Sequence, residues 1–267
     1  MSDPILIGVG STEAQMLPLQ VLAWTLQKHT RRELEIVPLW QARIPVPLPK
    51  DRENQPRTPF TFQRFLLPEL GGFARKSIYL DSDMIVFRDI GELYDTPLDG
   101  ADVLGCEGTP GRRAVFSVLL IGESTRWRVS EIVDALDRGA LTYDALMYDF
   151  QVPGRMVPRL SFRWNSCELY EPGETRLLHY TDMWKQPWLV RSNPLAELWV
   201  RELCEAVEAG AIEIDFLEQC VARRWIRPSL VYQVRRGITD PGRLPLRVKL
   251  GDLSFDRYAR RQEYRIF

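Results

Sequence analysis

Two aspartates stand inside a stretch that otherwise has the pattern of a buried strand. Residues 77 to 87 are Ser-Ile-Tyr-Leu-Asp-Ser-Asp-Met-Ile-Val-Phe, so that a single serine, Ser82, separates Asp81 from Asp83. Burying two like charges side by side is costly unless a cation neutralises them. Hard divalent ions such as Mg²⁺ and Mn²⁺ take carboxylate oxygens and commonly complete their coordination with a substrate's phosphates. The pair therefore indicates a metal site for phosphate or nucleotide chemistry.

A histidine far downstream is the candidate for a third ligand. His179 follows two leucines and opens the run His-Tyr-Thr-Asp-Met-Trp-Lys-Gln-Pro-Trp, which ends at Trp188. A neutral imidazole is a good ligand for a first-row metal, and Lys185 in the same run would offer a point charge to phosphate oxygens. The second histidine, His29, lies near the end of a predicted helix, where we interpret it as a surface or capping residue.

The elements that must position these groups follow an alternating pattern. An apolar run at 5–9 is followed by Gly10, Ser11 and Thr12 and then by a helical pattern at 16–29, which is how nucleotide-binding α/β domains often begin. Further strands are predicted at 34–40, 101–106 and 115–121, helices at 60–70 and 124–136, and an irregular proline-rich loop at 43–59. The alternation predicts an α/β fold with a mainly parallel sheet flanked by helices, with ligands at the carboxyl ends of its strands.

Composition sets few limits on function. The chain has 267 residues, of which 45% are hydrophobic and 27% charged, as in an ordinary globular protein with one large domain. No apolar run is long enough to span a membrane, and residues 1–4 lack the layout of a signal peptide, so that we expect a cytoplasmic protein. The four cysteines are widely spaced and form no CxxC pair, which favours buried thiols over disulfides or a zinc site.

Charge is distributed unevenly along the chain. Residues 222–267 contain twelve Arg or Lys against four Asp or Glu, together with Trp225, Tyr232, Phe255, Tyr258, Tyr264 and Phe267. We therefore divide the chain into a catalytic domain at 1–221 and a basic, aromatic C-terminal extension at 222–267 that packs on it. Such a composition is typical of contact with an anionic membrane or a nucleic acid, and equally of a solvated arginine-rich helix face.

Three segments together resemble a known family. Residues 62–70, 76–86 and 179–188 are similar to the corresponding motifs of the family 8 retaining glycosyltransferases, which include glycogenin and the bacterial lipopolysaccharide galactosyltransferases. The resemblance covers roughly residues 5–190. It implies a GT-A fold, a UDP-sugar donor, and Mn²⁺ (or Mg²⁺) held by Asp81, Asp83 and His179.

Further residues carry over from the family's motifs. His179 and Lys185 match the H-x-x-G-x-x-K-P-W motif, although Asp182 replaces its glycine and Gln186 is an additional residue before the proline. Arg64 matches an arginine that faces the donor's phosphates and sugar in the family. The resemblance thus implies a donor and cofactor site formed by Val9, Gly10, Ser11, Thr12, Arg64, Ser82, Asn165, Asp182 and Lys185.

One family segment is matched only in part. Residues 142–150 are the best counterpart of D-Q-D-x-L-N-x-x-F, which supplies the group beneath the reacting sugar carbon, but Tyr143 stands where the family has glutamine. Asp144 is kept and is the candidate for a sugar contact. Tyr143 and Asp144 are therefore the catalytic candidates, while Asn165 matches a common Trp-Asn and is equally consistent with a structural amide.

The resulting hypothesis is transfer of a hexose from a UDP-sugar to a hydroxyl of a saccharide or lipid-linked acceptor, with retained anomeric configuration. We expect peripheral contact of the C-terminal extension with the inner face of the membrane, and no nucleic acid partner. Two alternatives stay open. A haloacid-dehalogenase-like phosphatase also begins its nucleophile motif as Leu-Asp-Ser-Asp does, although on its first strand, and a nucleotide-sugar-binding protein that has lost catalysis is consistent with Tyr143.

Overall fold

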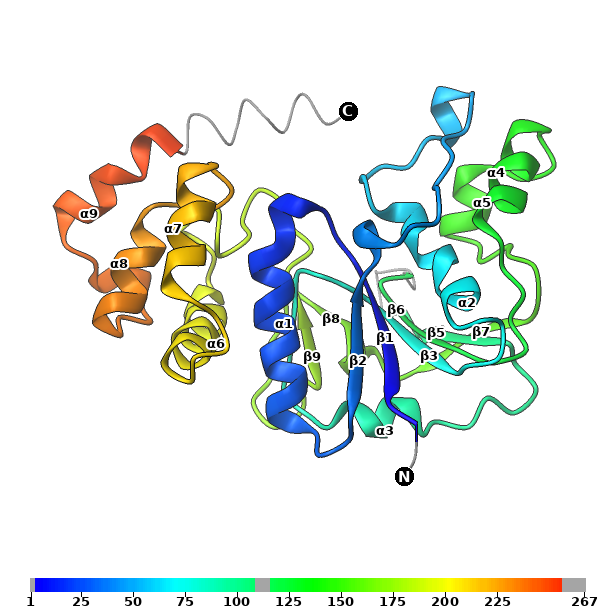
Figure 1. Cartoon of the computed structure of the whole chain (residues 1–267), viewed down its shortest axis with the longest axis horizontal. Coiled ribbons are helices and arrows are strands. Elements are labelled where there is room, and N and C mark those ends of the chain that lie inside the picture. Colours follow the sequence, from blue (N-terminus) through cyan, green and yellow to red (C-terminus); the bar gives the residue numbers. More distant parts are fainter. Residues whose placement is uncertain (1–2, 109–115, 256–267) are drawn as a thin grey trace.

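A six-stranded sheet forms the centre of the computed structural model, which describes residues 3–108 and 116–255 (Figure 1). Its strands are β2 (Leu34–Pro38), β1 (Ile5–Gly10), β3 (Ser77–Asp81), β6 (Val118–Ile121), β5 (Val103–Cys106) and β7 (Met156–Leu160), in that spatial order. The pairs β2·β1, β1·β3 and β5·β7 are parallel, whereas β6 is antiparallel to both β3 and β5. The expected mainly parallel α/β sheet is confirmed.

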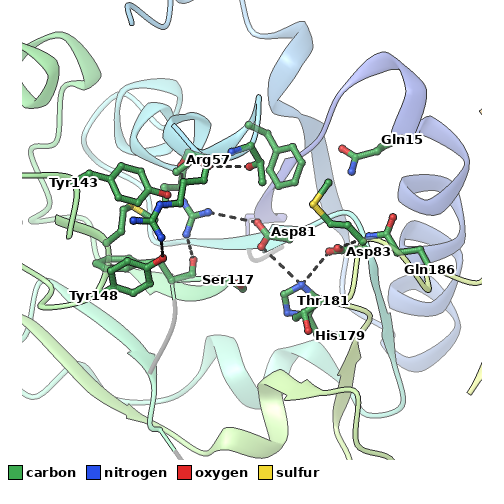
Figure 2. Close-up of a pocket in the computed structure, with 17 residues that line it drawn as sticks. Gln15, Arg57, Asp81, Asp83, Ser117, Tyr143, Tyr148, His179, Thr181 and Gln186 are labelled. Carbon is green, nitrogen blue, oxygen red and sulfur yellow. Dashed lines mark hydrogen bonds and ion pairs between the residues drawn. The ribbon is translucent and has the colours of Figure 1, made fainter. Parts of the chain in front are cut away.

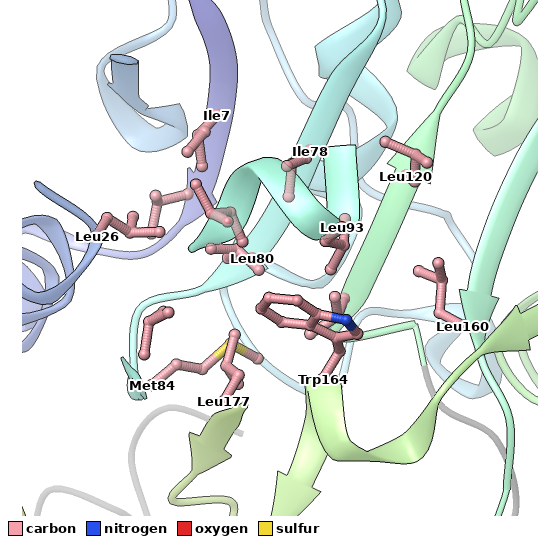
Figure 3. Close-up of a cluster of buried hydrophobic side chains, with 14 of the residues drawn as sticks. Ile7, Leu26, Ile78, Leu80, Met84, Leu93, Leu120, Leu160, Trp164 and Leu177 are labelled. Carbon is pink, nitrogen blue, oxygen red and sulfur yellow. The ribbon is translucent and has the colours of Figure 1, made fainter. Parts of the chain in front are cut away.

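Both faces of this sheet are buried. One face is covered by α1 (Met16–His29) and α3 (Ile90–Tyr94), and Figure 3 shows the resulting cluster, in which Ile7, Ile78 and Leu120 from three strands meet Leu26 of α1. The other face is covered by a 3₁₀ segment (Thr61–Leu66), α2 (Leu67–Leu70), α4 (Val129–Asp137) and α5 (Tyr143–Met147). This two-sided burial explains why the strands are continuous apolar runs instead of alternating ones.

Glycine is required where β1 passes β3. A Cβ on Gly10 would lie 2.2 Å from the hydroxyl oxygen of Tyr79, whose side chain crosses the end of β1. Any larger residue would displace the tyrosine. Gly10 at the end of β1 therefore makes room for the side chain whose hydroxyl contacts Asp81.

A second, smaller sheet continues from the end of β3. It consists of β4 (Met84–Val86), β9 (Leu177–His179) and β8 (Ser166–Cys167), with β9 in the middle. Behind it, α1 and the helices α6 (Ala196–Glu208), α7 (Ile214–Ala222) and α8 (Ser229–Arg236) form a third hydrophobic core. Trp188 and Trp199 lie in this core with ring centroids 5.2 Å apart. The chain between β9 and α6 is thus anchored against a packed helical layer.

Several predicted elements differ in extent or type. The predicted helix at 60–70 is a 3₁₀ segment that becomes α-helical only at Leu67, and the predicted helix at 124–136 begins at Val129. The residues before α4 turn instead, because Ser124 and Thr125 donate hydrogen bonds to the side chain and backbone of Asp102. The strand predicted at 34–40 ends at Pro38, and the loop at 43–59 contains one 3₁₀ turn, Arg52–Asn54.

The chain beyond Ala222 continues the helical layer. Ile226 and Leu230 are fully buried in the third core, and the loop after α8 leads through a 3₁₀ turn to α9 (Leu246–Gly251). A division of the chain at 221/222 stays a prediction, and residues on both sides of it share this core. Tyr258, Tyr264 and Phe267 of the predicted extension lie outside the described residues. Within the described part of the chain, no helix has the length and apolar character needed to cross a membrane.

Candidate functional site

The two aspartates lie where the central sheet gives way to the small one. Asp81 is the last residue of β3 and pairs in register with Gly10 of β1, while Asp83 precedes β4. The backbone N–H of Ser82 donates to Gly10 O at 3.1 Å, which fixes the turn between the two carboxylates. Both carboxylates are buried, with 7% and 6% of the residue exposed. Their placement at the carboxyl end of a buried strand is the one expected from the sequence.

Strand pairing brings His179 to these carboxylates. His179 ends β9 and pairs with Met84 in antiparallel register, and the N–H of Tyr180 donates to Asp83 O at 2.9 Å. The Nε2 atom of His179 lies 3.0 Å from Asp83 Oδ1 and 3.9 Å from Asp81 Oδ2, as the dashed lines in Figure 2 mark. One ligand atom from each of the three residues lies within 4.8 Å of the others.

Each of the three side chains is held by a partner on its far side. The Tyr79 hydroxyl donates to Asp81 Oδ1 at 2.6 Å, and Gln186 Nε2 donates to Asp83 Oδ2 at 2.9 Å. His179 Nδ1 lies 2.9 Å from Asn165 Oδ1, and because an amide oxygen only accepts, Nδ1 carries the hydrogen of that bond. These contacts leave one atom of each side chain directed toward the others.

The remaining atoms fit a divalent cation. Apart from its 3.0 Å ion contact with His179 Nε2, Asp83 Oδ1 has no partner among the described residues, and a buried carboxylate oxygen rarely stays without one. Two carboxylate oxygens and one imidazole nitrogen that face a common point are a ligand set for a first-row or hard divalent ion. The arrangement supports a metal site and does not identify the ion.

Electrostatics without a cation point the same way. Burial raises the pKa of Asp81, although the charges of Arg64 and His179 oppose the rise. Burial lowers the pKa of His179, but the interactions of its ring with Asp83 and Cys167 together outweigh burial and raise that pKa well above its usual value. The surroundings thus favour a positive charge beside the two carboxylates, and a bound metal would compete with the proton for the imidazole.

Arg64 supplies a fixed positive charge beside Asp81. It is 5% exposed, and its guanidinium donates to the backbone oxygens of Thr61 at 2.7 Å and Phe116 at 2.6 Å. The same group lies 3.7 Å from Asp81 Oδ1 and 4.8 Å from the centre of the Tyr79 ring. These four contacts hold the guanidinium beside the two carboxylates, so that the Arg64 side chain would lose little conformational freedom when an anion binds.

A cavity of about 230 Å³ opens over these groups. One side, which we call the strand wall, is formed by Asp81, Asp83 and His179. The opposite side, the loop wall, is formed by Arg57, Tyr143 and Tyr148 from the proline-rich loop and the region of α5. Figure 2 shows the two walls facing each other across the cavity, with Gln186 beside the strand wall.

The loop wall is organised around Arg57. Its guanidinium lies over the rings of Tyr143 and Tyr148, 4.7 and 5.3 Å from their centres, and donates to the Tyr148 hydroxyl at 2.8 Å. It also pairs with Asp144 at 2.9 Å. Asp144 does not line the cavity over the strand wall. Instead it lines a neighbouring cavity of about 640 Å³, together with Asp51, Glu53, Asn54, Arg57 and Tyr143.

The other residues singled out in the sequence lie at different distances from the cavity. Val9 and Gly10 end β1, and Ser11 is locked to Gln63, whose amide bonds both its N–H and its C=O. Thr12 N–H donates to Gln15, which does line the cavity. Ser82 is fully buried, and its hydroxyl has no hydrogen-bond partner among the described residues.

The run after β9 turns one predicted residue outward and an unpredicted one inward. The Lys185 side chain is 59% exposed and pairs with Asp182 at 3.2 Å, whereas Gln186 is 3% exposed and lines the cavity. Neither Lys185 nor Asp182 lines it. Gln186, Tyr79 and Arg57 were missed as site residues. Tyr79 had a usable signal, because it stands two residues before Asp81 and so shares its face of β3.

Comparison with known families assigns part of the chain. Residues 22–126 match the model of "Glycosyl transferase family 8", a span that contains Arg64, Asp81 and Asp83 and stops before His179. A glycosyltransferase 8 domain-containing protein 1 of Rattus norvegicus is 43% identical over 176 residues, covering 62% of this chain and 41% of the relative. The Arabidopsis thaliana "Protein CDI" is 24% identical, covering 79% of this chain and 91% of the relative. The chain spans about two fifths or less of the length of these glycosyltransferase 8 domain-containing relatives.

Solved structures agree in fold. The glycosyltransferase GlyE of Streptococcus pneumoniae TIGR4 superposes with a TM-score of 0.55 at 17% identity, over 79% of this chain and 64% of that one. At this identity the likeness concerns the fold alone. Together, the sequence match over residues 22–126 and the shared architecture confirm the resemblance to the family 8 glycosyltransferases and the GT-A type of fold.

Proposed function

We propose that the chain is a metal-dependent, retaining glycosyltransferase that moves a hexose from a UDP-sugar to an acceptor hydroxyl. The observation that carries this proposal is the convergence of Asp81 Oδ2, Asp83 Oδ1 and His179 Nε2 at one side of a cavity, next to the buried charge of Arg64. A cation and a fixed guanidinium side by side are suited to a diphosphate.

Asp81, Asp83 and His179 would hold Mn²⁺ (or Mg²⁺), which when bound supplies Lewis-acid neutralisation of the departing diphosphate. Arg64 adds a positive charge that needs no reorganisation, because its position is fixed by backbone oxygens before the donor binds. Lys185 lies on the exposed side of the same run and would reach the diphosphate after leaving its ion pair with Asp182. That exposed pair is weak and easily broken.

The end of β1 is the proposed place for the nucleoside. Val9, Gly10, Ser11 and Thr12 lie beside Asp81 at the carboxyl ends of adjacent parallel strands, the usual ligand position in α/β sheets. Ser82 lies in the turn between Asp81 and Asp83, and its hydroxyl has no hydrogen-bond partner among the described residues. We include it with Asn165 and Asp182 in the proposed donor and cofactor site, where Asn165 acts through His179.

The loop wall is the proposed place for the reacting sugar and the acceptor. Burial raises the pKa of Tyr143, so that its hydroxyl stays protonated near neutral pH and acts as a hydrogen-bonding group, not as a base. In this proposal, Asp144 leaves its ion pair with Arg57 and contacts sugar hydroxyls. Retention requires no protein base, because on a same-face substitution the leaving phosphate oxygen accepts the proton of the acceptor hydroxyl.

The test is release of UDP. The protein is incubated with MnCl₂ and a panel of UDP-sugars, with and without EDTA, and compared with Asp83→Ala. We expect metal-dependent UDP release from one or a few donors and none from the variant. Full activity of Asp83→Ala would end the proposal. Tight binding of UDP and Mn²⁺ without sugar release would favour the binding protein that has lost catalysis, and turnover of p-nitrophenyl phosphate would favour the phosphatase.

We also propose peripheral contact with an anionic membrane on the cytoplasmic side. In α9 and just after it, Leu246, Leu250 and Leu253 are 72%, 54% and 48% exposed, and Arg247 and Lys249 lie among them. Apolar side chains next to basic ones match the surface of anionic lipid. Deletion of 222–267 would remove Ile226 and Leu230 from the third core. The cleaner test is Leu250→Ser with Leu253→Ser, which should reduce binding to phosphatidylserine vesicles; unchanged binding would contradict the proposal.

A further inference from the structure

In the run between β9 and α6, the buried side chain of Gln186 contacts the candidate metal ligand Asp83. Its residue is 3% exposed, and its Nε2 donates to Asp83 Oδ2 at 2.9 Å and to Tyr180 O at 3.3 Å. Both hydrogens of the amide therefore have acceptors. The amide is directed at Asp83 from the side opposite His179, as Figure 2 shows.

This contact makes the two oxygens of Asp83 unequal. Oδ2 is occupied by the amide, and Oδ1 faces His179 Nε2 without a hydrogen bond of its own. A carboxylate without such a contact could rotate about its last bond, and a cation would have to order it on binding. Tyr79 has the same role for Asp81. Its hydroxyl donates to Asp81 Oδ1 and leaves Oδ2 directed toward His179.

The chemical nature of the donor matters as much as its position. An amide orients a carboxylate while leaving its negative charge available, whereas an ammonium in the same place would neutralise it and compete with a cation. In this chain the neighbouring ammonium, Lys185, is turned to the surface and paired with Asp182. The neutral donor faces the site and the charged one does not.

The backbone on either side of Gln186 is fixed. The N–H groups of Leu189 and Val190 donate to its carbonyl oxygen at 2.9 and 3.0 Å. Arg227, fully buried at the start of α8, donates from Nε to Pro187 O at 3.0 Å and from its backbone N–H to Trp188 O at 2.8 Å. The amide is thus preorganised by the packed helical layer and does not depend on the exposed part of the run.

We propose that Gln186 is a positioning residue that orients Asp83 Oδ1 toward the cation and so sets the affinity of the site for a divalent metal. The inference rests on the proposed metal-dependent function. Residues that hold a ligand through its outer atom typically change metal affinity by about 10–100-fold when they are replaced. Gln186 belongs to this class because it contacts the ligand and not the cation.

The experiment measures metal binding directly. Gln186→Met keeps the length and approximate volume of the side chain and removes the donor. Mn²⁺ is titrated into wild-type protein and variant without any donor sugar, and free ion is counted by electron paramagnetic resonance. We expect the variant to bind Mn²⁺ at least about 10-fold more weakly.

Asn193→Ala is the matched control. Asn193 is also buried and bonds the same run, donating to Lys185 O at 2.7 Å and accepting from Leu195 N–H at 2.7 Å, but it does not contact the ligands. Asn193→Ala should lower the melting temperature and leave the Mn²⁺ affinity within about twofold of wild type, because the contacts to the candidate ligands are intact. If it weakens Mn²⁺ binding as much as Gln186→Met does, the effect is loss of the run's structure, and the inference is overturned.

The rate of UDP release gives a second reading. In Gln186→Met the Mn²⁺ concentration for half-maximal rate should rise by the same factor as the dissociation constant, while the rate at saturating Mn²⁺ stays within about threefold. Equal Mn²⁺ affinity of wild type and variant overturns the inference and leaves the proposed function standing. Failure of the wild-type protein to bind Mn²⁺ overturns both.

Discussion

The strand wall and the loop wall face the same cavity, and they are held in different ways. Asp81, Asp83 and His179 are almost fully buried and come from strand ends whose hydrogen bonds fix them. Arg57 of the loop wall has a side chain that is 59% exposed, and it is held by ring contacts and by an ion pair with Asp144, which is 69% exposed and lies outside this cavity. The strand wall is therefore fixed by the fold itself, whereas the exposed side chains beside the cavity on the other side are held only by contacts that are easily exchanged.

This contrast separates two kinds of expected effect. Changes on the strand wall should act on metal binding and through it on every substrate. Changes on the loop wall should leave metal binding alone and act on the sugar or the acceptor. The largest effects are expected on the strand wall, because a buried group that loses its partner is destabilised most.

Removal of a candidate ligand should have the largest effect. His179→Ala takes away the imidazole and leaves two buried carboxylates with Arg64 alone, so Mn²⁺ affinity should fall by at least about 100-fold, more than loss of an outer hydrogen bond costs. The measurement is Mn²⁺ titration of the variant. As a control, the wild-type protein should lose UDP release on EDTA treatment and regain it when MnCl₂ is added. Wild-type affinity in this variant would show that the strand wall is not the metal site.

Loss of the Tyr79 hydroxyl should have the next largest effect. Tyr79→Phe keeps the ring beneath Arg64 and removes the 2.6 Å hydrogen bond to Asp81 Oδ1. We expect Mn²⁺ binding about 10-fold weaker and a free energy of unfolding lower by about 1–2 kcal/mol. Titration and chemical denaturation check the two parts. An unchanged affinity would mean that Asp81 needs no partner to bind a cation.

Next to the loop wall, where Asp144 pairs with Arg57, Asp144→Ala should separate sugar contact from metal binding. Because Asp144 is absent from the strand wall, Mn²⁺ affinity should stay within about twofold, while kcat/KM for the donor falls by about 10-fold through loss of charge-assisted hydrogen bonds to sugar hydroxyls. Steady-state kinetics at saturating Mn²⁺ measures the fall. If kcat/KM does not change, Asp144 is not a sugar contact.

The smallest effect is expected for the stability of the loop wall. Arg57→Ala removes an exposed ion pair and two ring contacts, and such interactions contribute about 1 kcal/mol or less in total. The free energy of unfolding should change by no more than that, and the difference should shrink in high salt. A loss of several kcal/mol would mean that the loop wall is as firmly built as the strand wall.

The same contrast explains what the sequence could predict. Asp81 and Asp83 are recognisable because charge inside an apolar strand is unusual, and β-strand periodicity alone gives the face shared with Tyr79. The pairing of β9 with β4, which brings His179 to Asp83, involves partners far apart in the chain. Periodicity contains no information on that pairing, and His179 is singled out instead by its residue type and by the family's motif.

Irregular segments were predicted less well. Whether Lys185 or Gln186 faces the site depends on the turn at Asp182 and on anchoring by Arg227, and neither follows from local pattern. Arg57 lies in a loop whose proline and charge content predicts only exposure. In the predicted basic extension, Arg227 is fully buried and donates to Pro187 O and to the side chain of Gln233, which a count of charges does not reveal.

The proposed function requires a divalent cation bound between the two aspartates and the histidine. Crystals of the protein grown with UDP and MnCl₂, measured at the manganese absorption edge, test this directly. We expect one anomalous peak within about 2.5 Å of Asp81 Oδ2, Asp83 Oδ1 and His179 Nε2, next to the diphosphate. UDP bound in the cavity with no anomalous peak at these three atoms would contradict it.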